Sequence, residues 1–327
     1  MSDETFLVTG AMGCIGAWVL RNLVAGGTPV VAADLATDPV RPSLVMTPKQ
    51  LAQVTFARLD ITDLKAVQTL VEQYRVTHII HLAGLQVPFC KANPALGARV
   101  NVVGTVNIFE VARQLPGQVR GLSYASSLAV LGPAHLYREL PVPDNVPLYP
   151  ATLYGVYKQA NEQTARIYWQ DWQVGSVGLR PYIVYGVGRD QGMTSGIAKA
   201  ILAAAAGRPY QIKFDGPVAL QYTDDMARIF ITAARAEYAG AAACNLRNDV
   251  VTVSEFISYL QAQVPQAQIT CVPASPLPFP ADLDDSGLRA ILGEIPHTPL
   301  PTAIRATLDL FEPLLAENRI DLSQLDS

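Results

Sequence analysis

The feature of the sequence that most constrains its fold is a loop with three glycines near the N-terminus. Residues 5–9 are rich in β-formers, residues 17–24 have a helical apolar pattern, and residues 10–16 join them with glycines at the spacing GxxGxxG. Between a strand and a helix, one glycine permits a tight turn, another lets backbone N–H groups approach a diphosphate, and the third packs the helix on the strand. We therefore predict a dinucleotide site at Gly10, Gly13, Cys14, Ile15 and Gly16, the alternative being that the glycines serve only the turn.

Strand and helix patterns alternate through the first half of the chain. Further β-forming runs end at residues 33, 59, 83 and 125, and helical windows cover residues 64–74 and 98–114. Such alternation implies βαβ crossovers and a parallel sheet covered on both faces. The sequence predicts an α/β fold with a doubly wound cofactor domain over residues 1–178 and a smaller mixed α/β substrate lobe over residues 179–327. The two parts are expected to be interleaved and to share a cleft.

Acidic residues follow the second and third predicted strands. Asp34 lies where a carboxylate accepts from an adenosine ribose 2′-hydroxyl and repels a 2′-phosphate, and residues 35–37 bring no cation. We therefore predict NAD rather than NADP as the cofactor, with a helix cap as the other interpretation of Asp34. Asp60 and Ile61 are predicted to contact the adenine, although Asp60 is also typical of a surface cap.

Composition excludes several classes of protein. Half of the 327 residues are hydrophobic, 16% are charged and the net charge is −4, so the chain is predicted to be globular and not a nucleic-acid binder. The first residues are acidic and polar, and the longest aliphatic run is short, so we expect a cytoplasmic protein with no membrane segment. The four cysteines are predicted to be free thiols. Neither they nor the four histidines have metal-ligand spacing, and no metal site is expected.

A tyrosine and a lysine four residues apart predict a proton-transfer site. Tyr154 and Lys158 would lie on one face of a helix, and Ser127 ends the strand before it. Oxidation of a secondary alcohol needs a base whose pKa lies near neutrality, and a nearby ammonium favours a phenolate. We predict Tyr154 as the base, Lys158 as the group that lowers its pKa, and Ser127 as the donor to the substrate oxygen. The other interpretation is a packed tyrosine and a solvated lysine on an amphipathic helix.

Taken together, the motifs resemble the extended short-chain dehydrogenase/reductase family, the group of NAD-dependent epimerases and dehydratases. The resemblance rests on the glycine loop, His81-Leu82-Ala83-Gly84, Asn101 in NVVGT, Ser126-Ser127, Tyr154-x-x-x-Lys158, Arg180-Pro181 and Tyr222-x-Asp224-Asp225. It implies a Rossmann-type fold, a bound nicotinamide cofactor and Ser127, Tyr154 and Lys158 as the catalytic triad. It also implies that Leu82, Ala83, Gly84 and Asn101 bind the cofactor, and that helices near residues 98–114 and 151–172 form a homodimer.

Three departures from the family pattern narrow the expected activity. Leu128-Ala129 stands where dehydratases tend to carry an Asp-Glu pair, which disfavours dehydration. Nucleotide-sugar enzymes often hold the diphosphate with an Asn near position 183 and an Arg near position 218. This chain has Ile183 and Val218 there, although Arg189 or Arg305 could supply the charge from elsewhere.

The sequence therefore predicts an NAD-dependent oxidoreductase that acts on a secondary alcohol or ketone of a sugar-like or sugar-acid substrate. The alternative is a nucleotide-sugar 4-epimerase with tightly bound NAD, and a regulatory NAD sensor is a third reading, which the intact triad disfavours. Side chains predicted to contact the polyhydroxy substrate follow strands, and each could equally be a packing residue. They are Gln86, Phe89, Ser127, Tyr182, Met193 and Thr194.

Overall fold

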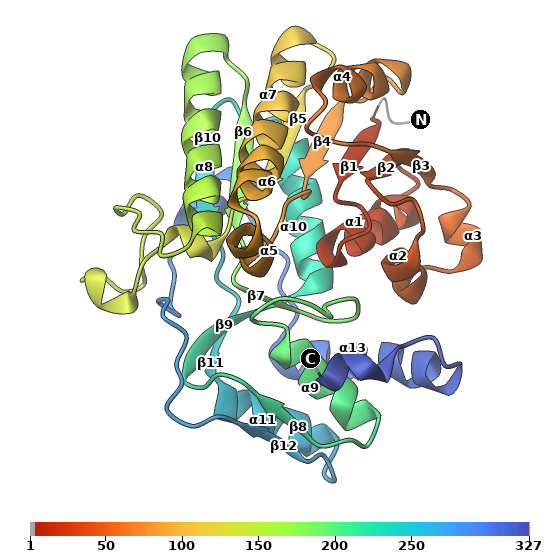
Figure 1. Cartoon of the computed structure of the whole chain (residues 1–327), viewed down its shortest axis with the longest axis vertical. Helices are drawn as coiled ribbons and strands as arrows, with labels where there is room; N and C mark the ends of the chain where they lie inside the picture. Colours follow the sequence, from red (N-terminus) through yellow and green to blue (C-terminus); the bar gives the residue numbers. More distant parts are fainter. Residues whose placement is uncertain (1–3, 327) are drawn as a thin grey trace.

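A seven-stranded parallel sheet forms the centre of the computed structural model, which describes residues 4–326 (Figure 1). The strand order is β10-β6-β5-β4-β1-β2-β3. The strands are β1 (Phe6–Thr9), β2 (Val30–Asp34), β3 (Thr55–Arg58), β4 (His78–His81), β5 (Gly121–Ala125), β6 (Ser176–Arg180) and β10 (Ala241–Asn245). The order reverses between β1 and β4, which is where ligands bind at the carboxyl ends of such strands. The predicted doubly wound Rossmann-type fold is confirmed.

Helices cover both faces of this sheet and bury it in two apolar cores. One face carries α4 (Leu64–Gln73), α7 (Gly104–Gln114) and α8 (Leu153–Trp172), whose side chains pack with those of β4 and β5. The other face carries α1 (Cys14–Ala25) and α10 (Thr223–Arg235), which also contact each other. Burial on both faces explains the apolar residues that these strands carry.

The predicted helix over residues 98–114 is divided in the structure. It consists of the end of α6 (Pro94–Ala98), a π-helical turn (Arg99–Val103) and α7. The turn includes Asn101, which is buried. π-Helical turns inside α-helices are frequent at functional sites.

The first sheet is completed by residues from the second half of the chain. β10 pairs in parallel with β6, and α10 packs against β5 and β4. At this contact the Ser123 Oγ donates a hydrogen bond to the carbonyl of Phe230 at 2.9 Å, and Gly121 leaves no room for a Cβ beside the carbonyl of Ala234. The chain thus crosses back into the cofactor domain beyond residue 179, and a division at residue 178 stays a prediction.

The remaining elements form the smaller lobe, in the lower part of Figure 1. A three-stranded sheet has the order β11-β9-β7, and β12 pairs with β8 in a second, two-stranded sheet. The strands are β7 (Ile183–Tyr185), β8 (Tyr210–Ile212), β9 (Pro217–Tyr222), β11 (Asp249–Thr252) and β12 (Ile269–Cys271). The helices are α9 (Gly196–Ala205), α11 (Val253–Gln263), α12 (Ser286–Leu292) and α13 (Leu300–Ala316). Short helices α2 (Val40–Val45), α3 (Pro48–Leu51) and α5 (Val87–Ala92) lie in the first half of the chain.

Within residues 4–326, no helix is both long and apolar enough to cross a membrane. All four cysteines are free, as predicted. No three His, Cys, Asp or Glu side chains of the described part of the chain are grouped as metal ligands would be.

Candidate functional site

The glycine loop is shaped by two close backbone approaches. Gly10 has a φ of +69°, a conformation that side chains rarely adopt, and a Cβ on it would lie 2.6 Å from the backbone nitrogen of Ala83 after β4. A Cβ on Gly16 would meet the carbonyl of Gly10. Any larger residue at either position would push the loop away from β4 or from the first turn of α1. The loop therefore lies between the carboxyl ends of β1 and β4.

Helix α1 directs its N-terminus at this loop. Gly13 is the N-cap, and the first turn begins at Cys14 and has no acidic residue. The first N–H groups of a helix lack intrahelical acceptors and attract anions, which fits a diphosphate. Burial raises the pKa of the Cys14 thiol to about 12, so the side chain is neutral and does not repel one. Cys14 and Ile15 would therefore contribute through their backbone.

Asp34 ends β2 beside the glycine loop. Its carboxylate accepts hydrogen bonds from the backbone nitrogens of Met12 at 3.0 Å and Leu35 at 2.8 Å. A cation that the sequence reasoning missed lies close by, because Arg41 donates to the Met12 carbonyl at 3.2 Å. Arg41 is paired with Asp190 at 2.9 Å, so its charge is balanced within the protein.

Asp60 and Ile61 follow β3, as predicted, but differ in exposure. The Asp60 carboxylate is exposed and accepts from the Thr62 backbone nitrogen at 2.9 Å, which lowers its pKa. This turn agrees with the interpretation of Asp60 as a surface cap, and its contact with adenine stays a prediction. Ile61 is buried against Gly104, where a Cβ would lie 2.5 Å from the Ile61 Cδ1 atom.

Ser127, Tyr154 and Lys158 are brought together by β5 and α8. Thr152 caps α8 by accepting from the Gly155 nitrogen at 3.1 Å, which sets Tyr154 and Lys158 on the first two turns. The buried Lys158 ammonium donates to the Ala125 carbonyl at 2.7 Å and lies 5.7 Å from the centroid of the Tyr154 ring. The Ser127 hydroxyl is close enough to Tyr154 to lower the pKa of the phenol. The three side chains therefore form one contiguous group.

Burial dominates the electrostatics of this group. Burial raises the pKa of Tyr154 above its usual range, and the Ser127 hydroxyl and the charge of Arg189 offset this only in part. Desolvation thus outweighs the nearby charges in this structure, and the expected lowering of the Tyr154 pKa by Lys158 and the positive nicotinamide stays a prediction. Burial also lowers the pKa of Lys158, to about 8. Tyr154 is a neutral phenol at pH 7.

Asn101 and Gly84 lie beside the lysine. A Cβ on Gly84 would lie 2.6 Å from the Asn101 Oδ1 and 3.5 Å from the Lys158 Nζ. The amide nitrogen of Asn101 donates to the carbonyls of Leu85 at 3.1 Å and Gly97 at 3.0 Å. Its Oδ1 is buried and has no hydrogen-bond partner among residues 4–326. A buried acceptor without a partner is costly, so this oxygen fits a ligand donor.

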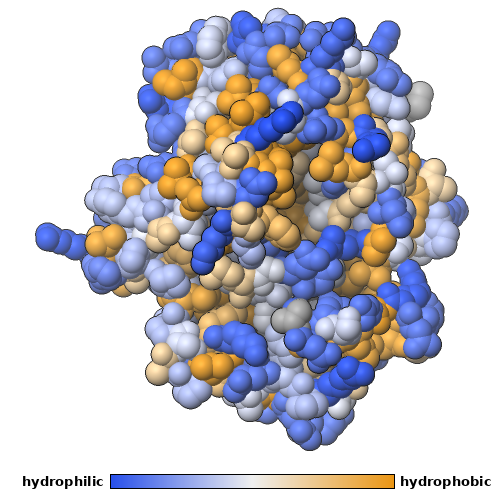
Figure 2. All heavy atoms as spheres, in the orientation of Figure 1, coloured by the Kyte–Doolittle hydropathy of each residue, from blue (hydrophilic) through white to orange (hydrophobic). Residues whose placement is uncertain are grey.

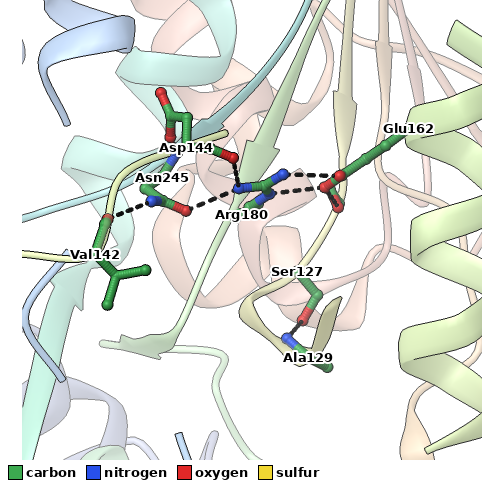
Figure 3. A network of polar contacts seen from close by, with 8 residues as sticks. Ser127, Ala129, Val142, Asp144, Glu162, Arg180 and Asn245 are labelled. Carbon is green, nitrogen blue, oxygen red and sulfur yellow. Dashed lines mark hydrogen bonds and ion pairs between the residues drawn. The ribbon is translucent and has the colours of Figure 1, made fainter. Parts of the chain in front are cut away.

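A buried ionic network lies behind Ser127 (Figure 3). Arg180 pairs with Glu162 through two hydrogen bonds of 2.8 and 2.9 Å, and it donates to the Asn245 Oδ1 at 3.1 Å. Glu162 lies one helical turn after Lys158 and also accepts a hydrogen bond of 2.5 Å from the Oγ of Ser126, the residue before Ser127. The network joins α8, β6 and β10 and fixes the end of β5. Sequence reasoning assigned no role to Glu162.

The predicted substrate residues differ in their neighbours and in their exposure. Gln86 and Thr194 lie near Arg189: the Arg189 Nη2 donates to the Thr194 Oγ1 at 3.3 Å, and a Cβ on Gly192 would meet the Gln86 Oε1. Tyr182 is buried and its ring contacts Phe279. Two further predicted residues are about half exposed, Phe89 at 49% and Met193 at 59%. Their contacts with substrate stay predictions.

Comparison with known proteins identifies the family. The model of the NAD dependent epimerase/dehydratase family matches residues 6–246. The chain belongs to this family. It is an NAD-dependent enzyme of the extended short-chain dehydrogenase/reductase type, and the glycine loop, Asp34 and the unpartnered oxygen of Asn101 fit that cofactor.

The relatives of the chain by sequence include UDP-sugar 4-epimerases. It is 30% identical over 318 residues to UDP-glucose 4-epimerase of Mycolicibacterium smegmatis, covering 93% of this chain and 97% of that one. It is 30% identical over 232 residues to UDP-glucuronate 4-epimerase 4 of Arabidopsis thaliana, covering 68% of this chain, and spans about half (52%) of that longer protein.

Solved structures share the fold over almost the whole chain. A partial consensus L-threonine 3-dehydrogenase has a TM-score of 0.81 at 23% identity, covering 95% of this chain and 100% of that one. UDP-glucose 4-epimerase of Thermotoga maritima, solved with UDP-glucose, has a TM-score of 0.81 at 21% identity with the same coverage. At such identities the likeness shows the fold alone, so the activity has to be argued from the site.

Proposed function

We propose that the protein is an NAD-dependent dehydrogenase that interconverts a secondary alcohol and a ketone on a small polyhydroxy substrate, such as a sugar or sugar acid. The observation that carries the proposal is the contiguous group of Ser127, Tyr154 and Lys158 beside the glycine loop. We assign the cofactor to the residues predicted from the sequence around that loop and around Asp34, Gly84 and Asn101.

Each member of the group has a distinct task in the proposed reaction. NAD, when bound, accepts or supplies the hydride. Tyr154 exchanges the proton of the substrate hydroxyl, and Ser127 donates a hydrogen bond to the substrate oxygen, which orients it toward Tyr154. Lys158 is held by the Ala125 carbonyl, so its side-chain nitrogen stays beside the phenol.

The protonation of Tyr154 bears on the direction of the reaction. A phenol whose pKa is raised by burial stays protonated at neutral pH, so its proton is present for transfer to a ketone, whereas the phenol accepts a proton only after it has ionised. At neutral pH the site is therefore better suited to protonating the oxygen of a ketone than to removing the proton of an alcohol. Alcohol oxidation then becomes faster as the pH rises.

A small substrate is supported by the residues where a nucleotide would be held. Ile183 pairs with Leu220 between β7 and β9, and both side chains are fully buried, as is Val218. None of them can offer a charge or a hydrogen bond to a diphosphate. Arg305, which could have replaced the missing charge, is on α13 and pairs there with Asp309 at 2.7 Å and with Glu312 at 2.6 Å.

The second candidate is a nucleotide-sugar 4-epimerase, favoured by the 30% identity to the Mycolicibacterium enzyme over 97% of its length. A panel of sugars, sugar acids, polyols and UDP- or dTDP-sugars distinguishes the two activities, with NADH formation and product stereochemistry both followed. A dehydrogenase forms NADH in proportion to ketone and leaves the nucleotide sugars unchanged. Conversion of a UDP- or dTDP-sugar into its 4-epimer with no free NADH would refute our proposal.

We also propose that the chain forms a homodimer through the helices near residues 98–114 and 151–172, together with α5 and α6 beside them. Large apolar side chains on these helices and the π-helical turn are between 43% and 49% exposed, namely Phe89, Leu96, Val103, Leu153 and Val156. Figure 2 shows apolar side chains gathered over the α5 and α6 region. Such a patch is typical of an interaction surface. Light scattering should give twice the chain mass for the wild type and the single mass for Val156→Glu, and a wild type that stays monomeric would refute the dimer.

A further inference from the structure

The loop after β7 brings a guanidinium to the candidate site without a carboxylate partner. Arg189 makes no ion pair among residues 4–326, whereas its neighbour Asp190 is occupied by Arg41. The Nε of Arg189 is buried and has no hydrogen-bond partner in the described part of the chain. A desolvated, charged N–H without an acceptor is unfavourable, so the position is suited to an anion that enters from outside.

The surroundings of Arg189 indicate which anion this is. Its Nη2 contacts Thr194, and Gly192 brings the Gln86 oxygen next to it, so neutral polar groups from the loops after β4 and β7 flank the guanidinium. Its charge is close enough to lower the pKa of Tyr154. A group bound here therefore lies near the proton-transferring phenol, and hydroxyls attached to the same molecule can reach Gln86 and Thr194.

Charge balance favours one singly charged group. The nitrogens on one edge of a guanidinium match the two oxygens of a carboxylate. The cofactor diphosphate already has the N–H groups at the start of α1, and a nucleotide-sugar diphosphate would bring two negative charges to the one positive charge of Arg189.

We propose that Arg189 is a substrate-binding residue that holds the carboxylate of a hydroxy acid, so that the substrate is a sugar acid rather than a neutral sugar or a nucleotide sugar. This inference rests on the proposed function, since it places the carboxylate relative to the Tyr154 group. Arg41 supports the arrangement by tying Asp190, and with it the loop that carries Arg189, to the glycine loop.

Binding measured without turnover tests the proposal. The probes are aldonates of four to six carbons, each compared with the alditol in which CH₂OH replaces the carboxylate, titrated into the enzyme–NADH complex by calorimetry. The tightest aldonate should bind at least tenfold more tightly than its alditol. Arg189→Met should weaken that aldonate by about 10²-fold, the loss expected for hydrogen bonds to a charged group, and should leave alditol and NADH affinities within threefold. Arg189→Lys should retain part of the preference.

Arg305→Met is the matched control, because it removes the same charge from the exposed face of α13. It should leave aldonate affinity unchanged. The inference is overturned if aldonates bind no better than alditols, if Arg189→Met chiefly weakens NADH, or if it chiefly weakens UDP. If an aldonate binds through Arg189 and is not oxidised, the dehydrogenase proposal alone is refuted. If a neutral alditol is oxidised and Arg189→Met does not change the rate of that oxidation, the carboxylate site alone is refuted.

Discussion

Removal of Glu162 should destabilise the protein by several kcal/mol, because it leaves Arg180 buried without its counter-ion. The Arg180 side chain is only 3% exposed and donates four hydrogen bonds, two of them to Glu162. In Glu162→Ala the Nε and Nη2 donors lose their acceptors, at about 1–3 kcal/mol each. The sum agrees with the about 3–5 kcal/mol found when one partner of a buried pair is removed.

The double variant Glu162→Met/Arg180→Met gives a sharper test. Replacing both charges by apolar side chains of similar volume is often neutral or stabilising, so the double variant should be at least as stable as the single Glu162→Ala variant. Urea unfolding followed by circular dichroism measures the free energies. Exposed Glu312→Ala on α13 is the control and should cost less than about 1 kcal/mol. A Glu162→Ala cost as small as this control would show that water or another residue satisfies Arg180, and the argument from burial would be wrong.

Four further outcomes follow from the site. Tyr154→Phe should lower turnover by about 10²–10⁴-fold while NAD still binds. Tyr157→Phe, which loses only a hydrogen bond to the Pro94 carbonyl, should lower turnover only slightly. A larger loss in Tyr157→Phe than in Tyr154→Phe would refute the assignment of Tyr154. The rate of alcohol oxidation should rise from pH 7 toward pH 10 and that of ketone reduction should not, because burial raises the pKa of Tyr154; a flat oxidation profile in stopped-flow kinetics would contradict this. Asp34 should give a lower dissociation constant for NAD than for NADP, and equal constants would mean that Arg41 leaves Asp190 to bind the 2′-phosphate. Burial raises the pKa of Asp144 to about 6. The stability that its protonated form contributes is therefore present below about pH 4 and is lost as the pH rises to about 6. Asp144→Asn should flatten the dependence of the unfolding free energy on pH over that range, and an unchanged slope would exclude Asp144 as its source.

The central sheet could be predicted from the sequence because its strands are short apolar runs that end at polar or glycine residues. The predicted strand that ends at residue 125 agrees with β5, and the helix expected near residues 151–172 agrees with α8 to within two residues. β10 could not be placed, because the residues AAACN carry no local sign that they pair with β6, more than 60 residues earlier in the chain.

The site was predictable where a motif defines it and not where burial or distant residues decide. The proximity of Ser127, Tyr154 and Lys158 follows from a strand end and a helical spacing of four. The raised pKa of Tyr154 depends on desolvation, which a sequence does not display. Arg41 could not be told apart from other surface arginines, and Arg189 could be named only together with Arg305, since the positions of Arg41 and Arg189 result from the loop after β7 folding back toward the glycine loop.

The return of the chain to the first sheet has a consequence for synthesis on the ribosome. When residue 180 has emerged, six strands of the sheet exist, but the edge of β6 and the apolar face later covered by α10 have no partner. Both are covered only once residue 245 has been made, after β7, β8 and β9 of the small lobe and before β11 and β12. A nascent chain arrested between these two points carries an open, apolar strand edge, the kind of surface that pairs with other chains. Ribosome-bound fragments ending before residue 241 should therefore depend on chaperones to stay unaggregated, and fragments extending past β10 and the exit tunnel should not.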